Sequence, residues 1–235
     1  MRTLARAGRC FAFSVMVWSS LAVSAQKTPN QVLRSVYQKM MKVKDYSVEA
    51  TIRADIPLIK ILPVNAVVYF KQPDKFRLVS KSIAILPRQG FSDLAKVIKD
   101  STAYTAVNTG NETVDNTPAR VISLIPASDT GDLVLAKFWI DVSRMLILKT
   151  QLTTRSSGTM QIEYFYGSQV SFGLPDKMIF TVDVKKFKIP KIVATDLKNP
   201  GPQTKENTKA SKKGVIDIKL QNYSINKGVK DEVFR

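Results

Sequence analysis

Apolar and polar residues alternate along most of this 235-residue chain, which is the pattern of strands that bury one face. The longest run extends from Tyr46 to Ile56, where every second residue is apolar. Other runs are rich in β-branched or aromatic residues and lie at 67–79, 104–107, 119–125, 134–142, 145–154, 158–166, 177–188 and 215–225. The pattern predicts about nine to eleven short antiparallel strands joined as a meander.

Two segments have helical spacing instead. Thr28, Pro29 and Gln31 form an N-cap with a capping box, and an apolar stripe follows. That stripe comprises Val32, Leu33, Val36, Met40 and Met41. A second short helix is predicted over 91–99. Each helix is either an ordinary core element or a displaceable lid over the sheet.

The run at 67–79 is a hairpin. Val67 to Phe70 and Phe76 to Val79 are two β-type runs, and Pro73 and Asp74 between them favour a chain reversal. Residues two apart in a strand share a face, so Val68 with Phe70, and Phe76 with Leu78, each point to one side.

Some runs are apolar on both faces, which a sheet with one wet face does not need. They lie at 66–70, 121–125 and 145–148. Either helices cover both faces or the sheet encloses an apolar cavity. A sheet of this size curls and needs a cover on its concave face, and two helices are too few for two faces. The cavity is therefore the preferred interpretation.

The first 25 residues read as a cleaved signal peptide. Arg2, Arg6 and Arg9 precede an uncharged apolar stretch, and Val23 and Ala25 supply small residues before the cleavage position. An uncleaved anchor is the alternative. Residues 26–235 are predicted to form a single domain, with a mobile Lys/Pro-rich loop at 196–214. The predicted location is the periplasm, with neither a membrane span nor a lipid anchor.

Composition limits the chemistry. The chain has no histidine, and its one cysteine, Cys10, lies in the predicted signal peptide. Triads, Cys–His pairs and the usual zinc sites cannot be assembled, so we expect no enzyme, cofactor or metal. A carboxylate-based hydrolase remains the chemical alternative. The formal net charge of the chain is +17. The lysines are spread through the chain and gather mostly near residues 185–213, which is more typical of solvated strand faces and a polar loop than of a binding stripe. Such a charge attracts anionic lipid headgroups or acidic partners, while export argues against nucleic acid.

Several segments, in order, resemble the outer-membrane lipoprotein carrier (LolA-like, lipoprotein-sorting) superfamily. The most specific is Lys71-Gln72-Pro73-Asp74-Lys75-Phe76-Arg77, which is similar to the family's basic-Pro-x-x-Phe-Arg segment. The other matching segments are 43–50, 110–120, 138–141 and 226–234. The resemblance implies a mostly β (α+β) fold, a curved antiparallel sheet forming an unclosed half-barrel with two helices over its concave face.

The resemblance also implies a function. A non-enzymatic carrier of this kind holds lipoprotein or lipid acyl chains in a hydrophobic cavity for transport toward the outer membrane. Its partners are an inner-membrane donor and an outer-membrane acceptor, and the carrier is a monomer. A lipid-responsive sensor that binds a membrane-bound protein is the alternative. The cavity residues carried over by position are Val68, Phe70, Gln72, Phe76, Leu78 and Trp139, with Val36 and Met40 on the lid helix.

One residue departs from the family pattern. The best-known carriers have an arginine directly before the turn proline, where it bonds backbone carbonyls of the lid. This chain has Gln72 there, which donates two hydrogen bonds but has neither a charge nor a rigid fork. Arg77 is predicted to face the other way.

Overall fold

The fold is taken from a computed structural model, which describes residues 27–57, 59–60, 62–81, 98–183 and 213–235. The predicted signal peptide, residues 91–97 of the predicted second helix and residues 196–212 of the predicted loop lie outside these ranges. The described elements are α1 (Pro29–Met40), β1 (Asp45–Ile56), β2 (Ile59–Lys60), β3 (Val64–Lys71), β4 (Lys75–Ser80), β5 (Tyr104–Val114), β6 (Thr117–Pro126), β7 (Leu133–Asp141), β8 (Leu146–Thr154), β9 (Gly158–Phe165), η1 (Val170–Phe172), β10 (Lys177–Asp183), β11 (Lys213–Ile225) and η2 (Asp231–Phe234).

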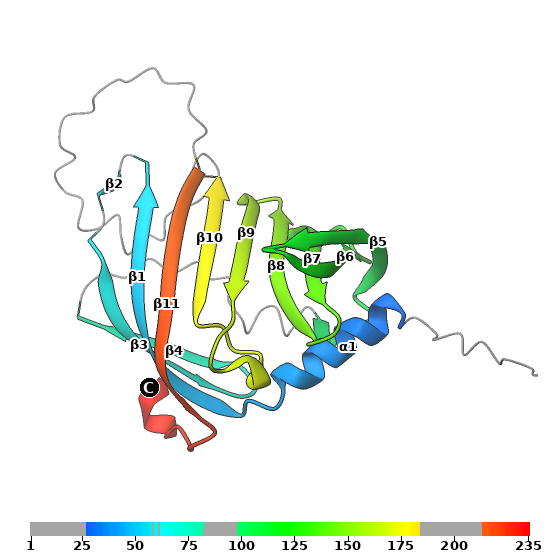
Figure 1. The fold of residues 1–235 in the computed structure, drawn as a ribbon. Helices are drawn as coiled ribbons and strands as arrows, with labels where there is room; N and C mark the ends of the chain where they lie inside the picture. Colours follow the sequence, from blue (N-terminus) through cyan, green and yellow to red (C-terminus); the bar gives the residue numbers. More distant parts are fainter. Residues whose placement is uncertain (1–26, 58, 61, 82–97, 184–212) are drawn as a thin grey trace, which may run out of the picture.

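All strands belong to one antiparallel sheet. Its order is β4-β3-β1-β11-β10-β9-β8-β7-β6-β5, and the two-residue β2 pairs beside β1. The sheet curves without closing, so β4 and β5 are its two edges (Figure 1). The predicted class, an unclosed antiparallel half-barrel, is confirmed.

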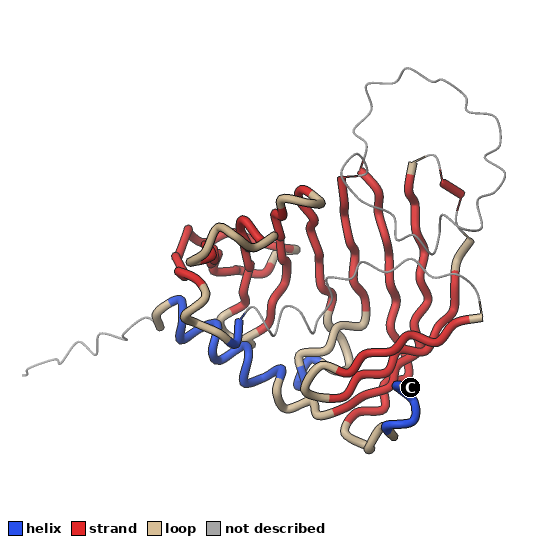
Figure 2. The backbone as a smooth tube through the Cα atoms, turned by 180° about the vertical axis from the view of Figure 1, so that it is seen from behind, coloured by secondary structure: helices blue, strands red, loops and turns tan. Residues whose placement is uncertain are grey.

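The meander prediction is wrong at one place. The last strand, β11, lies between β1 and β10 and pairs with both. This pairing joins the first and last described strands inside the sheet (Figure 1), which Figure 2 shows from behind. The predicted loop also ends earlier than expected, because Lys213 and Gly214 already pair with Asp183 and Val182.

The helix α1 begins where its sequence predicts. The Thr28 side chain and the Gln31 side chain form a reciprocal capping box around Pro29. The helix lies along the lower end of the sheet (Figure 1) and buries Val32 and Leu33 completely. The described end of the predicted second helix is helical, and its Ile98 is buried against the same core.

Alternation sorts the apolar residues onto two faces of the sheet. The main cluster occupies what we call the inner face, and it includes Val48, Phe138, Ile162 and Ile216 together with the stripe of α1. A second, small cluster lies on the opposite, outer face of β6–β8. It consists of Ala119, Val121, Trp139, Leu146 and Leu148. This outer cluster covers Val121, Leu146 and Leu148, the outward-facing apolar residues of the runs at 121–125 and 145–148, while Ile125 is half exposed.

Candidate apolar binding face

The β3–β4 hairpin places four of the predicted site residues side by side. The register pairs Val68 with Leu78 and Phe70 with Phe76. In an antiparallel pair, directly opposite residues share a face, so all four side chains lie on one surface. Val68 and Phe70 belong to the main cluster, and Leu78 packs against it. The hairpin therefore forms one end of the inner face.

Exposure rises steadily toward the edge strand. Val68 and Phe70, on β3, are 7% and 9% exposed, whereas Phe76, on β4, is 51% exposed. Phe70 also stacks on Tyr46 of β1, with ring centroids 5.3 Å apart. The inner face thus continues from a closed core to an aromatic side chain that is half in water.

Gln72 connects this hairpin to the end of α1. Its Nε2 atom donates to the carbonyl oxygens of Met41 and Val43, over 3.1 Å and 2.8 Å. Its backbone N–H donates to the Lys44 carbonyl as well. The glutamine therefore makes the two carbonyl contacts that its two amide protons allow, and it makes them to the segment that follows α1.

The predicted lid residues Val36 and Met40 are buried at 2% and 6% exposure. They face β8 and β9 across a crevice that also includes Ile147 and Tyr164 and has space for about one water molecule. In this conformation α1 is packed onto the sheet. A chain of methylenes can reach that part of the inner face only if α1 moves.

Trp139 is not part of this group. The prediction that it lines the same surface as Phe70 is wrong, because Trp139 lies in the outer cluster. Its indole N–H donates to the Glu112 carboxylate over 2.7 Å, and the Lys149 ammonium lies 4.6 Å from the ring centroid. Its neighbours Phe138 and Ile140 occupy the inner face instead.

The buried carboxylates are engaged within the protein, whereas the buried hydroxyl of Thr150, opposite Phe138 and Ile162 on the inner face, has no hydrogen-bond partner within the described part of the chain. The two buried carboxylates of the described residues, Asp45 and Asp141, accept from the Gly228 backbone N–H and from Ser143 and Arg144 respectively. Burial raises the pKa of Tyr46 well above its ordinary value, so its phenol stays protonated. The described inner face offers apolar contact rather than a reactive group.

Sequence reasoning missed two residues that shape this site. Tyr223 packs edge-on against Tyr46 with ring centroids 5.8 Å apart, and its hydroxyl donates to the Pro175 carbonyl. Asn226 accepts from the Lys44 backbone N–H over 2.7 Å and donates to the Lys42 carbonyl over 3.0 Å. Both residues are brought to this site by the pairing of β1 with β11. The alternation of apolar and polar residues does not predict which strands pair.

The fold and this face define a class of protein: an open β half-barrel with an apolar inner surface and a helix packed over part of it. No family model and no curated protein matches the chain by sequence. Solved structures do match. A domain named for outer membrane lipoprotein sorting, from Vibrio parahaemolyticus, aligns with a TM-score of 0.57 at 8% identity, covering 88% of this chain and 95% of that one.

Two further structures agree. A LolA superfamily protein from Nitrosomonas europaea aligns with a TM-score of 0.53 at 12% identity, over 86% of this chain and 97% of that one. A DUF1329 family protein from Desulfovibrio piger aligns with a TM-score of 0.53 at 12% identity, over 89% and 98%. The chain therefore has the fold of the LolA-like superfamily. Among its described helices, none is long and apolar enough to cross a membrane.

Proposed function

We propose that this protein is a non-enzymatic, extracytoplasmic binding protein that holds acyl chains of lipoproteins or lipids on its inner face. In this proposal the chain is exported, residues 1–25 are removed, and the loaded protein carries its cargo toward the outer membrane. The observation that carries the proposal is the continuity of the apolar inner face from the buried core to the half-exposed Phe76.

The energetics of acyl binding suit such a face. Each methylene removed from water contributes about 0.8 kcal/mol, so a long acyl chain offers roughly 10 kcal/mol before ordering costs. Release requires that part of this energy opposes the closed position of α1. The two uncharged hydrogen bonds from Gln72 to the segment after α1 restrain the closed position of the helix only weakly.

The hairpin allows a test with a matched control. Phe76 and Val79 lie on the same strand with exposures of 51% and 46%, but Val79 pairs with Val67 on the outer face. Phe76→Glu introduces a charge on the inner face, and Val79→Glu introduces the same charge on the outer face of the same strand. Only the first substitution alters the proposed binding surface.

The measurement is native mass spectrometry of the exported protein, combined with titration by a fluorescent acyl probe and a triacylated peptide. We expect the wild type and Val79→Glu to bind with similar affinity. Phe76→Glu should bind at least about tenfold more weakly, because an acyl chain that covers position 76 would remove water from the new carboxylate. Wild-type protein that binds neither ligand, or two variants that bind alike, would contradict the proposal.

A further inference from the structure

Three loops come together at the lower end of the half-barrel, and hydrogen bonds fix them to each other. Asn226 joins the loop after β11 to the loop after α1, and Gln72 joins the β3–β4 turn to that same loop. Lys71 donates to the Val229 carbonyl over 3.0 Å. We call this end, residues 41–45, 71–75 and 226–230, the basic end.

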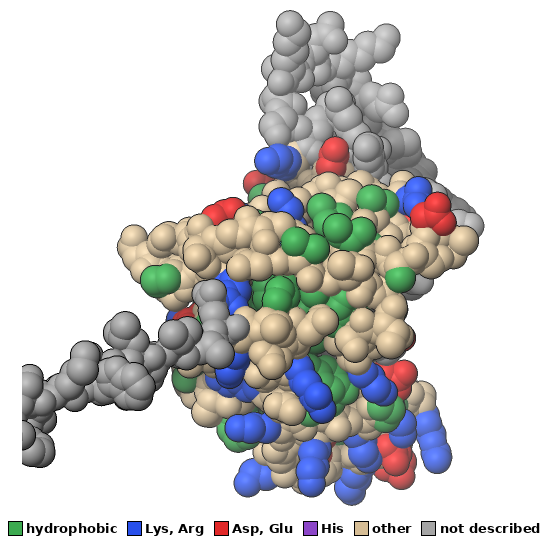
Figure 3. Space-filling model, turned by 90° about the vertical axis from the view of Figure 1, so that its right-hand side faces the viewer, with side chains coloured by type: hydrophobic (Ala, Val, Ile, Leu, Met, Phe, Trp, Pro, Cys, Tyr) green, Lys and Arg blue, Asp and Glu red, His purple; other side chains and the backbone are tan. Residues whose placement is uncertain are grey.

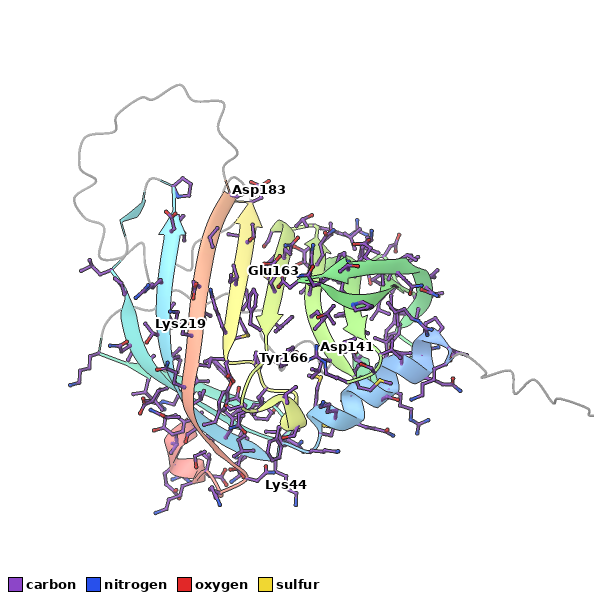
Figure 4. All side chains as sticks on the ribbon, in the orientation of Figure 1. Lys44, Asp141, Glu163, Tyr166, Asp183 and Lys219 are labelled. Carbon is purple, nitrogen blue, oxygen red and sulfur yellow. The ribbon has the colours of Figure 1, made fainter. Side chains whose placement is uncertain are left out.

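The basic end gathers lysines that are far apart in the sequence. Lys42 and Lys44 flank the contact with Asn226, while Lys227 and Lys230 follow it, and all four are exposed. Figure 4 labels Lys44 at the lower edge of the molecule, and Figure 3 shows blue Lys and Arg side chains projecting from this end. Lysines that are far apart in the sequence thus form a cluster in space.

The basic end contains six lysines and two aspartates, Asp45 and Asp74. The Asp45 carboxylate is buried and accepts from the Gly228 N–H. Asp231 lies between Lys71 and Lys75, 2.9 Å from each ammonium nitrogen. Its carboxylate therefore compensates the charges of Lys71 and Lys75 and not those of the four exposed lysines. The four exposed lysines therefore project a positive potential into solvent.

We propose that the basic end binds the anionic surface of a phospholipid membrane. The four groups are all ammonium ions on flexible stems, without the rigid fork by which arginine matches fixed carboxylates. Such point charges suit a fluid array of phosphate headgroups better than a specific acidic protein surface.

The basic end lies beside the end of α1. Membrane contact at the basic end would orient the Gln72 contacts and the end of α1 toward the bilayer. Binding there uses headgroup charge and is independent of any acyl chain on the inner face.

The experiment is co-sedimentation with vesicles of phosphatidylcholine alone and of phosphatidylcholine mixed with phosphatidylglycerol. One variant carries Lys42→Gln, Lys44→Gln, Lys227→Gln and Lys230→Gln. The control variant carries Lys81→Gln, Lys99→Gln, Lys213→Gln and Lys219→Gln, which are exposed lysines outside the basic end and give the same net charge. Soluble polyglutamate serves as the acidic-polypeptide probe.

We expect wild type and the control variant to bind the anionic vesicles and not the neutral ones. The basic-end variant should bind at least about tenfold more weakly, and added salt should weaken the wild type. Equal losses in the two variants would overturn the proposal, as would wild-type protein that binds polyglutamate but not vesicles. Acyl-probe binding in solution should be the same for all three proteins, so this test and that of the proposed function fail separately.

Discussion

The side-chain amide of Gln72 donates to the backbone carbonyl of Val43 across 2.8 Å, which joins the β3–β4 turn to the segment between α1 and β1. A second bond from the same nitrogen reaches the Met41 carbonyl. An uncharged residue thus makes the carbonyl contacts that the resemblance assigns to an arginine in the best-known carriers. A neutral hydrogen bond contributes about 1 kcal/mol, roughly half of a charge-assisted one.

Gln72→Leu should loosen α1 without unfolding the sheet. The substitution removes two hydrogen bonds worth about 2 kcal/mol together, but it keeps the backbone bond from residue 72 to the Lys44 carbonyl. Amide hydrogen exchange should accelerate in α1 and stay unchanged in β6–β8. Gln72→Arg is the control, since its guanidinium retains donors for both carbonyls. Equal acceleration in the two variants would show that the amide does not restrain α1.

Asn226→Gly should destabilise the protein by about 1–2 kcal/mol, because it removes the hydrogen bonds from the Lys44 N–H and to the Lys42 carbonyl. Asn226 has a φ of 55°, which glycine adopts without strain, so the substitution isolates the side-chain bonds. Asn222→Gly is the matched control, with a φ of 57° and one exposed bond to Glu49. Urea unfolding should separate the two variants, and similar midpoints would refute this role for Asn226.

The fluorescence of Trp139 should not respond to an acyl ligand. It is the one tryptophan outside the predicted signal peptide, and it lies in the outer cluster, away from the inner face. Emission should stay constant during titration with an acyl probe. A Trp139→Phe, Phe76→Trp double variant moves the reporter to the inner face, where emission should shift to the blue as water is excluded. A large change from Trp139 itself would place the ligand on the outer face.

The contact between η2 and the hairpin should open in strong acid. The Lys75 and Lys71 ammonium groups hold the pKa of Asp231 at about 2, below its ordinary value. Because the pKa of Asp231 is lowered in the folded state, its ion pairs contribute their full stabilisation at pH values above the pKa that Asp231 has in the unfolded chain. This stabilisation is lost as the pH falls toward 2. Carboxyl NMR shifts of Asp231 should report the titration directly, with Lys71→Gln and Lys75→Gln each raising the midpoint. A midpoint near 4, the ordinary aspartate value, would contradict the ion pairs.

Alternation determined the faces of the strands before any tertiary information. Tyr46 to Ile56 forms β1 with the predicted side buried, and Val68, Phe70, Phe76 and Leu78 share the face that a two-residue period assigns them. The capping residues around Pro29 likewise fixed the start of α1. These features depend on neighbours within a few residues, so the local sequence carries them.

Trp139 shows where the local pattern stops being sufficient. A strand with apolar residues on both sides is expected to be buried on both faces, but its sequence does not show what covers each face. The second cover in β6–β8 is the outer cluster, to which Val114 of the adjacent strand and Tyr166 and Val170 of a later segment contribute. The apolar run alone therefore does not distinguish a cavity from a cover on the outer face.

Residue patterns alone were enough to predict a mostly β chain, its strand faces, its capped first helix and the absence of histidine chemistry. They could not predict that β11 lies between β1 and β10, that Asn226 and Gln72 meet the loop after α1, or that Lys42, Lys44, Lys227 and Lys230 share one end. The difference lies in how far along the chain each effect acts. Periodicity and capping act over a few residues, whereas strand order and charge clusters depend on contacts between segments up to about two hundred residues apart, which no local pattern encodes.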